Sequence, residues 1–481
     1  MRRQEKGAPV WAVTLCCACL YALSLGRGFY ASDGDVMFLT TAALATEGTL
    51  ALPPDPALPQ IVAGQGGRSY SKYDPGLPLL AVPFFIAGDR LAALNEAHRT
   101  QVAATAALLL PALAGAGAVT ALYALARRLF GAGRGLTVAL AAALATPLWP
   151  YSRMLFAESV LACALTVSVA LIVRAPSSRR ALVVAGAVFG VGVLTRAALA
   201  IYALPLAWLL ASASADRGLR AVGRRWAAFA LGALPLALGL LAHNALRFGD
   251  PLRFGYAGEG FTAPLLKGVA GLLLSPGKSV LIYAPPLALA ALLGRRFWRS
   301  ERALAGFLAL AWGVALIFYG AWWAWHGGWS WGPRFLVPLL PLSCLPLGEL
   351  PMRRGWRSAL VVALALSAAV NALGVLTDPV APYAQASVSG VTDYDAIHWQ
   401  FASSPVVIAI ERLAGGQTEP LALFHLSGSG LPRTWTIGVP LAALLGLALG
   451  AAIIVRDVWR AGSSCQSRPR AAQSGAKQPE Q

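Results

Sequence analysis

Long apolar runs, separated by short clusters of arginine, constrain this chain more than any other feature. A helix needs about 20 apolar residues to cross the hydrocarbon core of a bilayer, and many of these runs approach that length. Only 12% of the residues are charged and 57% are hydrophobic, whereas about 25% of the residues in an average soluble domain are charged. We therefore predict an all-α polytopic membrane protein.

The apolar runs predict about twelve transmembrane helices. A thirteenth run, at 77–87, is too short to span and contains Pro78 and Pro83, so we expect it to be re-entrant or interfacial. The twelve expected spans lie near residues 9–26, 101–126, 135–150, 156–173, 181–195, 197–211, 226–246, 279–293, 303–323, 334–348, 358–376 and 434–455.

The charge distribution orients this bundle. With a cytoplasmic N-terminus and alternating spans, 25 of the 39 Lys and Arg residues but only 6 of the 21 Asp and Glu residues fall on the cytoplasmic side, as the positive-inside rule requires. Orientation thus explains the net charge of +18, and we do not expect nucleic-acid binding. We expect a bacterial inner-membrane protein with both termini in the cytoplasm. Function then faces outward, where the long connectors 27–100, 247–278 and 377–433 lie.

The domain organisation is expected to be simple. Residues 1–461 should form one transmembrane domain with a structured first outer loop, and the polar residues 462–481 a disordered cytoplasmic tail. The N-terminal apolar run exceeds a signal-peptide core and lacks a cleavage site, so we expect it to remain as the first helix. No internal repeat is visible, which disfavours an inverted-repeat transporter, and the cysteines have no metal-ligand spacing.

Polar residues return in the first outer loop, which begins GFYASDGDVMF at Gly28. Asp33 and Asp35 lie one residue apart, just beyond the first span. Such an acid is a general base, a metal ligand, or a cap for the amphipathic segment 36–47 that follows. Capping explains one acid more easily than both, so a functional role stays open beside it, as does a divalent metal held by Asp33 and Asp35.

Several cations lie at the outer ends of expected spans. Lys72 and Tyr73, in YSKYDPG, are candidates for binding lipid phosphate or sugar, and Lys72 pairs either with Asp74 or with a phosphate. Arg153 lies between the third and fourth spans, and Arg196 between the fifth and sixth. Each either extends to the membrane interface or binds an anionic head group in an outer cavity.

The segment AWWAWHGGWSWGPR, at 321–334, is rich in tryptophan. An aromatic belt at the outer interface explains part of it, but indole faces also suit sugar rings and isoprenoid chains. His326, Trp329 and Arg334 are therefore candidates for binding lipid phosphate or sugar, as is Lys278 at the start of the eighth span. His326 alone does not make a metal site.

These segments, in this order, resemble the polytopic glycosyltransferases of the GT-C superfamily, especially bacterial relatives of the protein O-mannosyltransferases and the lipid A aminoarabinose transferase. The resemblance extends over most of the chain. It rests on ASDGD after the first span, EGTL, YSKYDPGLPLLAVPF, PYSRMLFAES, LTRAAL, NALRFGDPLRFGY, LLLSPGKSVLIYAPP and WSWGPRFLVPLLPL.

The resemblance implies an inverting transfer of a sugar from a polyprenyl-phosphate donor to a hydroxyl of a glycan, lipid or protein acceptor on the outer face of the membrane. On that pattern the acid that activates the acceptor is Asp33 or Asp35, and Asp33 is favoured because it is the first acid after the span. The departing polyprenyl phosphate would be met by Lys72, Arg153, Arg196 and Arg334. The polyprenyl-phosphate sugar is thus the donor substrate, and the one cofactor considered is the divalent metal that Asp33 and Asp35 suggest.

A second class of function fits the same loops, namely a transporter of lipid-linked sugars or a non-catalytic lipid-binding protein. A transporter should carry charges in mid-span and helix breaks at matching positions of two halves. Here few charges fall in mid-span and the polar residues gather at one surface, which favours the transferase.

Overall fold

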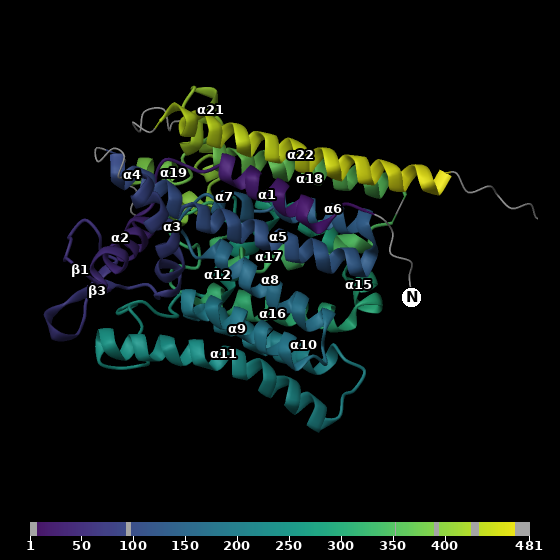
Figure 1. Ribbon diagram of the computed structural model, residues 1–481, viewed down its shortest axis with the longest axis horizontal. Helices are drawn as coiled ribbons and strands as arrows, with labels where there is room; N and C mark the ends of the chain where they lie inside the picture. The colour runs from purple at the N-terminus through teal and green to yellow at the C-terminus, as the bar shows by residue number, and fades with distance from the viewer. Residues whose placement is uncertain (1–6, 93–97, 352, 389–393, 425–431, 467–481) are drawn as a thin grey trace, which may run out of the picture.

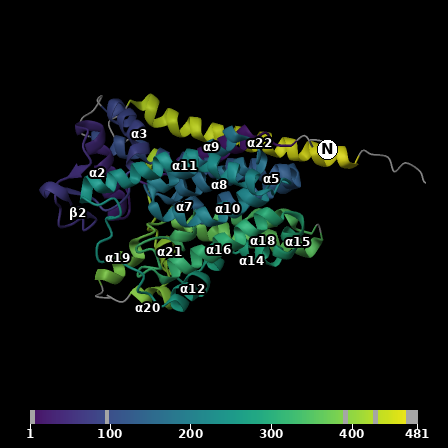
Figure 2. The ribbon, with the colours of Figure 1, turned by 90° about the horizontal axis from the view of Figure 1, so that it is seen from below.

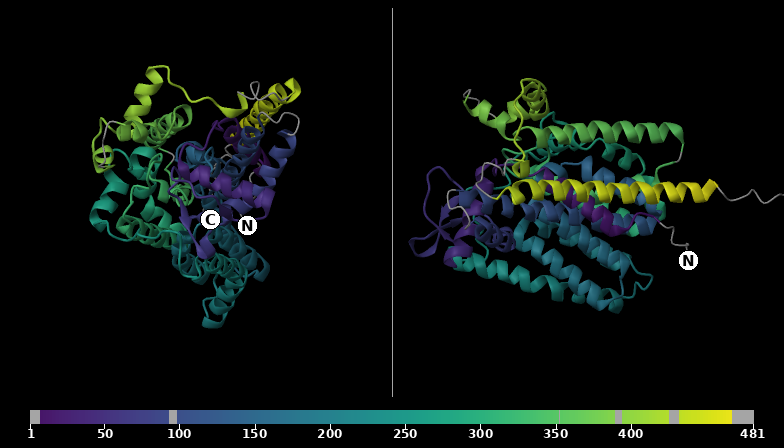
Figure 3. Two further views of the ribbon diagram at one scale, coloured as in Figure 1. Left: turned by 90° about the vertical axis from the view of Figure 1, so that its left-hand side faces the viewer. Right: turned by 45° about the horizontal axis from the view of Figure 1, so that its top comes forward.

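The computed structural model describes residues 7–92, 98–351, 353–388, 394–424 and 432–466. Long helices run side by side along one axis (Figure 1), and the green helices α14, α15, α16 and α18 form a separate layer when seen from below, whereas the last helix, α22, lies with the first half of the chain (Figure 2). The described ends of the chain lie at one end of the bundle and the first outer loop at the other (Figure 1). Viewed end-on, this loop lies in front of the bundle (Figure 3).

The first half of the chain carries all of the described strands. Its elements are α1 (Val10–Leu23), α2 (Ser32–Glu47), β1 (Ala51–Leu52), β2 (Ile61–Ala63), η1 (Gln65–Gly67), β3 (Ser69–Ser71), α3 (Gly76–Ala92), α4 (Arg99–Ala107), α5 (Leu109–Phe130), α6 (Ala132–Leu144), α7 (Leu148–Tyr151), α8 (Glu158–Arg174), α9 (Arg179–Thr195), η3 (Ala197–Tyr202), α10 (Ala203–Ser212) and α11 (Leu219–Phe248).

The second half is broken into more and shorter helices, and its last helix returns to pack against α1. Its elements are α12 (Leu265–Leu274), α13 (Val280–Tyr283), α14 (Pro286–Leu292), α15 (Gly294–Ser300), α16 (Arg302–Ala321), η4 (Arg334–Leu336), α17 (Leu340–Ser343), η5 (Leu345–Glu349), α18 (Arg354–Leu376), α19 (Ala381–Val388), α20 (Tyr394–Trp399), α21 (Pro405–Ala414) and α22 (Arg433–Gln466).

Five helical segments in the described part of the chain are long and apolar enough to cross a bilayer. The chain is thus a mainly helical integral membrane protein, whereas the expected count of twelve continuous spans is not seen. The five segments are 99–130, 219–248, 302–321, 354–376 and 433–457.

Prolines explain why two of the expected spans are not continuous helices. Residues 334–349 form η4, α17 and η5 in succession because Pro338, Pro341 and Pro346 cannot donate backbone hydrogen bonds. Nearly all of this segment is buried inside the protein. Irregular backbone is tolerated at membrane depth only where protein covers it, and that condition is met here. The expected span 279–293 is likewise divided into α13 and α14, at Pro285.

The apolar segment 77–87 belongs to the continuous 17-residue helix α3, which contains Pro83. This helix packs against α2 and α4, so the chain does not reverse inside it as a re-entrant segment would. At the other end of the chain, α22 continues to Gln466, into the segment expected to be disordered. Residues 467–481 lie outside the described residues.

Small residues let two pairs of elements approach closely. A Cβ on Gly186 of α9 would collide with the Phe229 carbonyl of α11, and one on Gly232 of α11 with the Val183 carbonyl of α9, which is a small-residue interface typical of membrane helices. Gly76, at the start of α3, similarly lies against the backbone of Thr195. This second approach brings the first outer loop to the C-terminal end of α9.

Candidate functional site

The first outer loop positions its acids through the helix α2. Ala31 is the N-cap residue and forms no side-chain cap, so neither aspartate caps the helix, and Asp33 and Asp35 both lie in the first turn. The positive end of the helix dipole favours carboxylates there. Asp35 is exposed to solvent, whereas the side chain of Asp33 is only 19% exposed and points into the protein. The two acids therefore have different surroundings.

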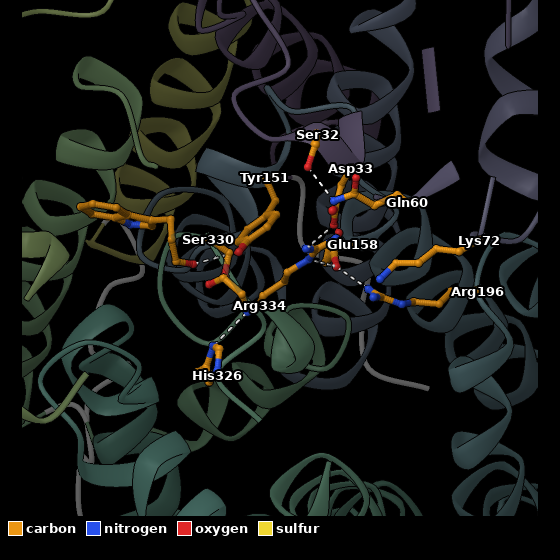
Figure 4. Close-up of polar contacts among 12 residues, drawn as sticks. Ser32, Asp33, Gln60, Lys72, Tyr151, Glu158, Arg196, His326, Ser330 and Arg334 are labelled. Atoms are coloured by element: carbon orange, nitrogen blue, oxygen red, sulfur yellow. Dashed lines mark hydrogen bonds and ion pairs between the residues drawn. The ribbon is translucent and has the colours of Figure 1, made fainter. Parts of the chain in front are cut away.

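Asp33 belongs to a network of four charged side chains from four parts of the chain, which meet in the centre of Figure 4. Arg334 Nη1 donates to Asp33 Oδ2 at 2.8 Å, and Arg334 Nε donates to Glu158 Oε1 at 2.7 Å. Arg196 Nη1 donates to the same Glu158 oxygen at 2.7 Å. We call Asp33, Glu158, Arg196 and Arg334 the charge quartet.

The two acids and two arginines of the quartet balance in charge, which is how ionised groups are kept inside a protein. Glu158, on the first turn of α8, is buried, and its Oε1 accepts from both arginines. Its Oε2 is also buried but has no protein partner. The Arg334 guanidinium lies 4.2 Å from the ring centroid of Phe156, and that of Arg196 lies 5.3 Å from that of Phe335.

The quartet holds Asp33 in its ionised form. Burial raises the pKa of this carboxyl, but Arg334, a hydrogen bond from Tyr73 and the charge of Lys72 outweigh it and leave the pKa below its ordinary value. Burial and the adjacent Asp33 charge raise the pKa of Tyr73, so its hydroxyl stays protonated and donates. Asp33 is thus an oriented carboxylate, able to accept a further proton.

A narrow pocket opens beside the quartet. It contains about 10 Å³ of free volume, which is about the space of one water molecule. The residues around it come from the first outer loop, the N-terminal side of α8, the C-terminal end of α9, the α11–α12 loop and η4: Asp33, Met37, Tyr73, Asp74, Leu155, Phe156, Ala157, Thr195, Arg196, Tyr256 and Arg334.

Asp74 lies between this pocket and a second one lined by Thr40, Leu50, Ser71, Tyr73, Pro75, Pro78, His243 and Arg247. Its Oδ2 accepts from the backbone N–H of Ala197 at 2.7 Å, while its buried Oδ1 has no protein partner. Burial raises the pKa of Asp74 to about 6, although Ala197 and nearby arginines lower it. Together with the close contact at Gly76, this bond fastens the loop to the start of η3.

Lys72 follows directly after β3, the central strand of an antiparallel sheet with the order β1-β3-β2, in which Ala51 pairs with Tyr70 and Ile61 with Ser71. Its Nζ donates to Glu259 Oε1 at 2.7 Å. The ammonium also lies over the rings of Tyr73 and Tyr256, at 5.5 and 5.4 Å from their centroids. The acid that Lys72 pairs with is therefore Glu259 and not Asp74, because Asp74 turns inward to Ala197.

Arg153 is fully buried and lies outside the pocket lining. Its Nη1 donates to the carbonyls of Gly374 and Val375, and its Nη2 to the Tyr30 hydroxyl. Tyr30 in turn donates to Glu419 Oε1 at 3.1 Å. Arg153 thus joins the start of the first loop to the end of α18.

Lys278, His326 and Trp329 gather in a second cluster, next to the turn that leads to Arg334. Lys278 Nζ donates to the Ser330 carbonyl at 2.8 Å and to its hydroxyl at 2.9 Å. Trp329 stacks on Tyr383 with centroids 6.2 Å apart. Burial and the nearby lysines Lys278 and Lys267 lower the pKa of His326 to about 3, so it is neutral at physiological pH. None of the three sequence candidates lines the pocket beside Asp33.

The candidates from the sequence thus divide into two groups. Asp33, Tyr73, Arg196 and Arg334 line one pocket, and Lys72 lies at its edge against Tyr73 and Tyr256. Asp35, Arg153, Lys278, His326 and Trp329 lie elsewhere. Glu158, Asp74, Tyr256 and Glu259 belong to the site but were not among the candidates. Glu158 carries a usable signal, since an ionisable residue at the start of an apolar span is a marker of function.

The donor set for a metal ion is small. Within the described ranges, no three His, Cys, Asp or Glu side chains form a group that could hold a metal ion. Asp33 and Glu158, the two acids of the quartet, both accept from Arg334. Arg196 and Arg334 also line the pocket and supply the cationic side chains of its wall.

A bundle of apolar helices with ionised side chains gathered at one end defines an integral membrane protein with a polar pocket at one end of the bundle. Residues 99–242 match the dolichyl-phosphate-mannose-protein mannosyltransferase family. The fold is similar to that of ArnT from Cupriavidus metallidurans bound to undecaprenyl phosphate, with 17% identity, a TM-score of 0.52, and 97% of this chain and 80% of that chain covered. No curated protein matches the sequence.

The apo state of the same ArnT is also similar, with 16% identity, a TM-score of 0.50, and 91% of this chain and 74% of that chain covered. The family match and the shared fold confirm the resemblance drawn from the motifs. Residues 99–242 thus match a family of membrane mannosyltransferases, and the chain as a whole shares the fold of ArnT.

Proposed function

We propose that this protein is an inverting glycosyltransferase that moves a sugar from a polyprenyl-phosphate donor to an acceptor hydroxyl outside the membrane. The observation that carries the proposal is the position of Asp33. It is an ionised, oriented carboxylate at the edge of a pocket that also contains two arginines. Base and anion-binding groups are thus within one site, as such a transfer requires.

In the proposed reaction, Asp33 accepts the proton of the acceptor hydroxyl. The acceptor oxygen attacks the anomeric carbon and forms the new glycosidic bond. The bond between that carbon and the phosphate oxygen breaks, and its electron pair leaves with the polyprenyl phosphate. Attack opposite the leaving group inverts the anomeric centre. Arg196, Arg334 and Lys72 stabilise the negative charge that the phosphate gains as it leaves.

Direct transfer tests the proposal. Purified protein is supplied with a polyprenyl-phosphate sugar, and release of polyprenyl phosphate is measured together with sugar on the acceptor. A deletion strain should accumulate the lipid-linked sugar. A donor that crosses a vesicle membrane unchanged, with no polyprenyl phosphate released, would identify a transporter instead.

Arg196 and Arg334 should hold the donor's phosphate. A hydrogen bond to a charged group contributes roughly 1.5–3 kcal/mol, so Arg196→Ala and Arg334→Ala should each weaken binding of undecaprenyl phosphate about ten- to hundredfold. Arg68→Ala is the matched control, because Arg68 is an exposed cation of the same outer side. If Arg196→Ala and Arg334→Ala both bind undecaprenyl phosphate with wild-type affinity, the two arginines only form ion pairs within the quartet.

The proposed orientation makes the site extracytoplasmic. In a Cys465→Ser background, Asp55→Cys in the first outer loop should react with a membrane-impermeant maleimide in intact cells. Arg217→Cys, between α10 and α11, should react only after permeabilisation. Both positions are solvent-exposed. The reverse pattern would place the pocket in the cytoplasm and exclude the proposed topology.

A further inference from the structure

The loop 249–264, between α11 and α12, contributes two side chains to the edge of the site. Tyr256 lines the pocket and Glu259 pairs with Lys72. The loop is held closely, because a Cβ on Gly255 would collide with the backbone of Lys72. Trp323, two residues after α16, holds the other end of the loop, since its backbone N–H donates to the Gly260 carbonyl at 2.9 Å.

Both oxygens of Glu259 are engaged. Oε1 accepts from Lys72 Nζ at 2.7 Å, and Oε2 accepts from Trp323 Nε1 at 3.0 Å. The side chains of Lys72 and Glu259 are only 19% and 20% exposed. The bond to Trp323 therefore orients the carboxylate toward Lys72, the cation at the edge of the pocket.

The pocket is too small to hold a sugar phosphate as it stands. It has room for about one water molecule, whereas sites for small molecules are typically about 300–1,000 Å³. Since Tyr256 forms part of its wall, enlarging the pocket on this side moves the loop that carries Glu259. Opening the site and releasing Lys72 are therefore coupled.

A phosphate and the Glu259 carboxylate are both anionic, so they repel each other when both approach one ammonium group. We propose that Glu259 is a positioning residue that competes with the donor's phosphate for Lys72, and that the donor displaces it as the 249–264 loop opens. The inference rests on the proposed function, because it takes the donor to be a polyprenyl phosphate.

Removing the charge of the competitor should strengthen donor binding. A partly exposed ion pair is worth about 0.4–1 kcal/mol, so Glu259→Gln should lower the Kd for undecaprenyl phosphate about two- to fivefold. Lys72→Gln should raise that Kd, and Glu259→Gln should have no further effect in the Lys72→Gln background. Undecaprenol, which lacks the phosphate, should bind wild type and Glu259→Gln equally.

Two more variants make the test specific. Asp250→Asn removes a negative charge from the same loop at an exposed acid whose side chain accepts from the backbone of Leu252, so it should leave the Kd unchanged. Trp323→Phe frees Glu259 Oε2 without altering charge and should also tighten binding. Thermal unfolding shows whether Glu259→Gln folds. If it does not, Trp323→Phe alone tests the competition.

Equal or weaker binding of undecaprenyl phosphate by Glu259→Gln and Trp323→Phe would overturn the competition, while leaving the proposed donor class intact. If Asp250→Asn lowers the Kd as much as Glu259→Gln does, the competition is overturned too, because the gain in affinity would then follow from the loss of any negative charge in the loop. If neither wild type nor any variant binds undecaprenyl phosphate, the proposed donor class fails and the inference fails with it.

Discussion

Asp33→Asn should lower the rate of sugar transfer by roughly a hundred- to ten-thousandfold, the range for a positioned general base. The asparagine keeps the shape of the side chain and one acceptor oxygen for Arg334, so the donor should bind with nearly wild-type affinity. The loss should therefore appear in kcat and not in KM. Single-turnover transfer by purified protein measures it.

Asp35→Asn is the matched control, because it makes the same chemical change two residues away on the exposed side of α2. Its turnover should remain close to wild type. If Asp33→Asn is inactive only because Asp33 binds a metal ion, added Mn²⁺ or Mg²⁺ should restore part of the activity. Near-normal turnover in Asp33→Asn would remove the proposed mechanism.

The pH dependence of the Asp33 variant follows from its lowered pKa. An acid whose pKa is depressed by folding stabilises the protein above its unfolded value of about 3.9, and this contribution is lost as the pH falls through the lower folded value. Asp33→Asn should therefore be less stable than wild type at neutral pH, and the gap should close below about pH 4. For the same reason, wild-type turnover should have no acidic decline near pH 6 that belongs to this group.

The sequence could predict which regions hold the site. Asp33, Tyr73, Arg196 and Arg334 were found because each polar side chain follows or precedes an apolar run, where solvation alone does not require it. The order of residues along the chain does not show which side chains form ion pairs, however. Arg334 lies about 300 residues from Asp33, yet the two side chains meet, since only the folded bundle brings the outer helix ends together.

Other features could not be obtained from local patterns. Hydropathy detects residues 334–348 as a span because they are apolar, but three prolines divide the backbone and burial in protein makes the breaks tolerable. The sequence also did not predict which acid pairs with Lys72. Asp74 is near in sequence, but the bond between Asp74 and the Ala197 N–H turns it away, and Glu259 reaches Lys72 from a distant loop.

Glu158→Ala should cause the largest loss of stability among the site variants. Glu158 Oε1 is the acceptor that Arg196 and Arg334 share, and all three residues lie in a buried region. Removing one partner of a buried ion pair leaves an uncompensated charge and costs about 3–5 kcal/mol. Glu158→Gln keeps an acceptor oxygen and should lose less. Thermal unfolding in detergent ranks these variants against wild type.

A double-mutant cycle separates lost charge pairing from lost packing. If the cost of losing Glu158 arises from stranded guanidinium groups, then Glu158→Gln together with Arg196→Gln should be less destabilised than the sum of the two single variants. Glu411→Gln, at an exposed acid of α21, is the control and should change stability by no more than about 0.5 kcal/mol. Strict additivity at 158 and 196 would show that Glu158 contributes by packing alone. In that case the Glu158 carboxylate would not restrain Arg196, and Arg196 would be available to the donor's phosphate. The same cycle therefore tests whether the quartet restrains Arg196 before the donor binds.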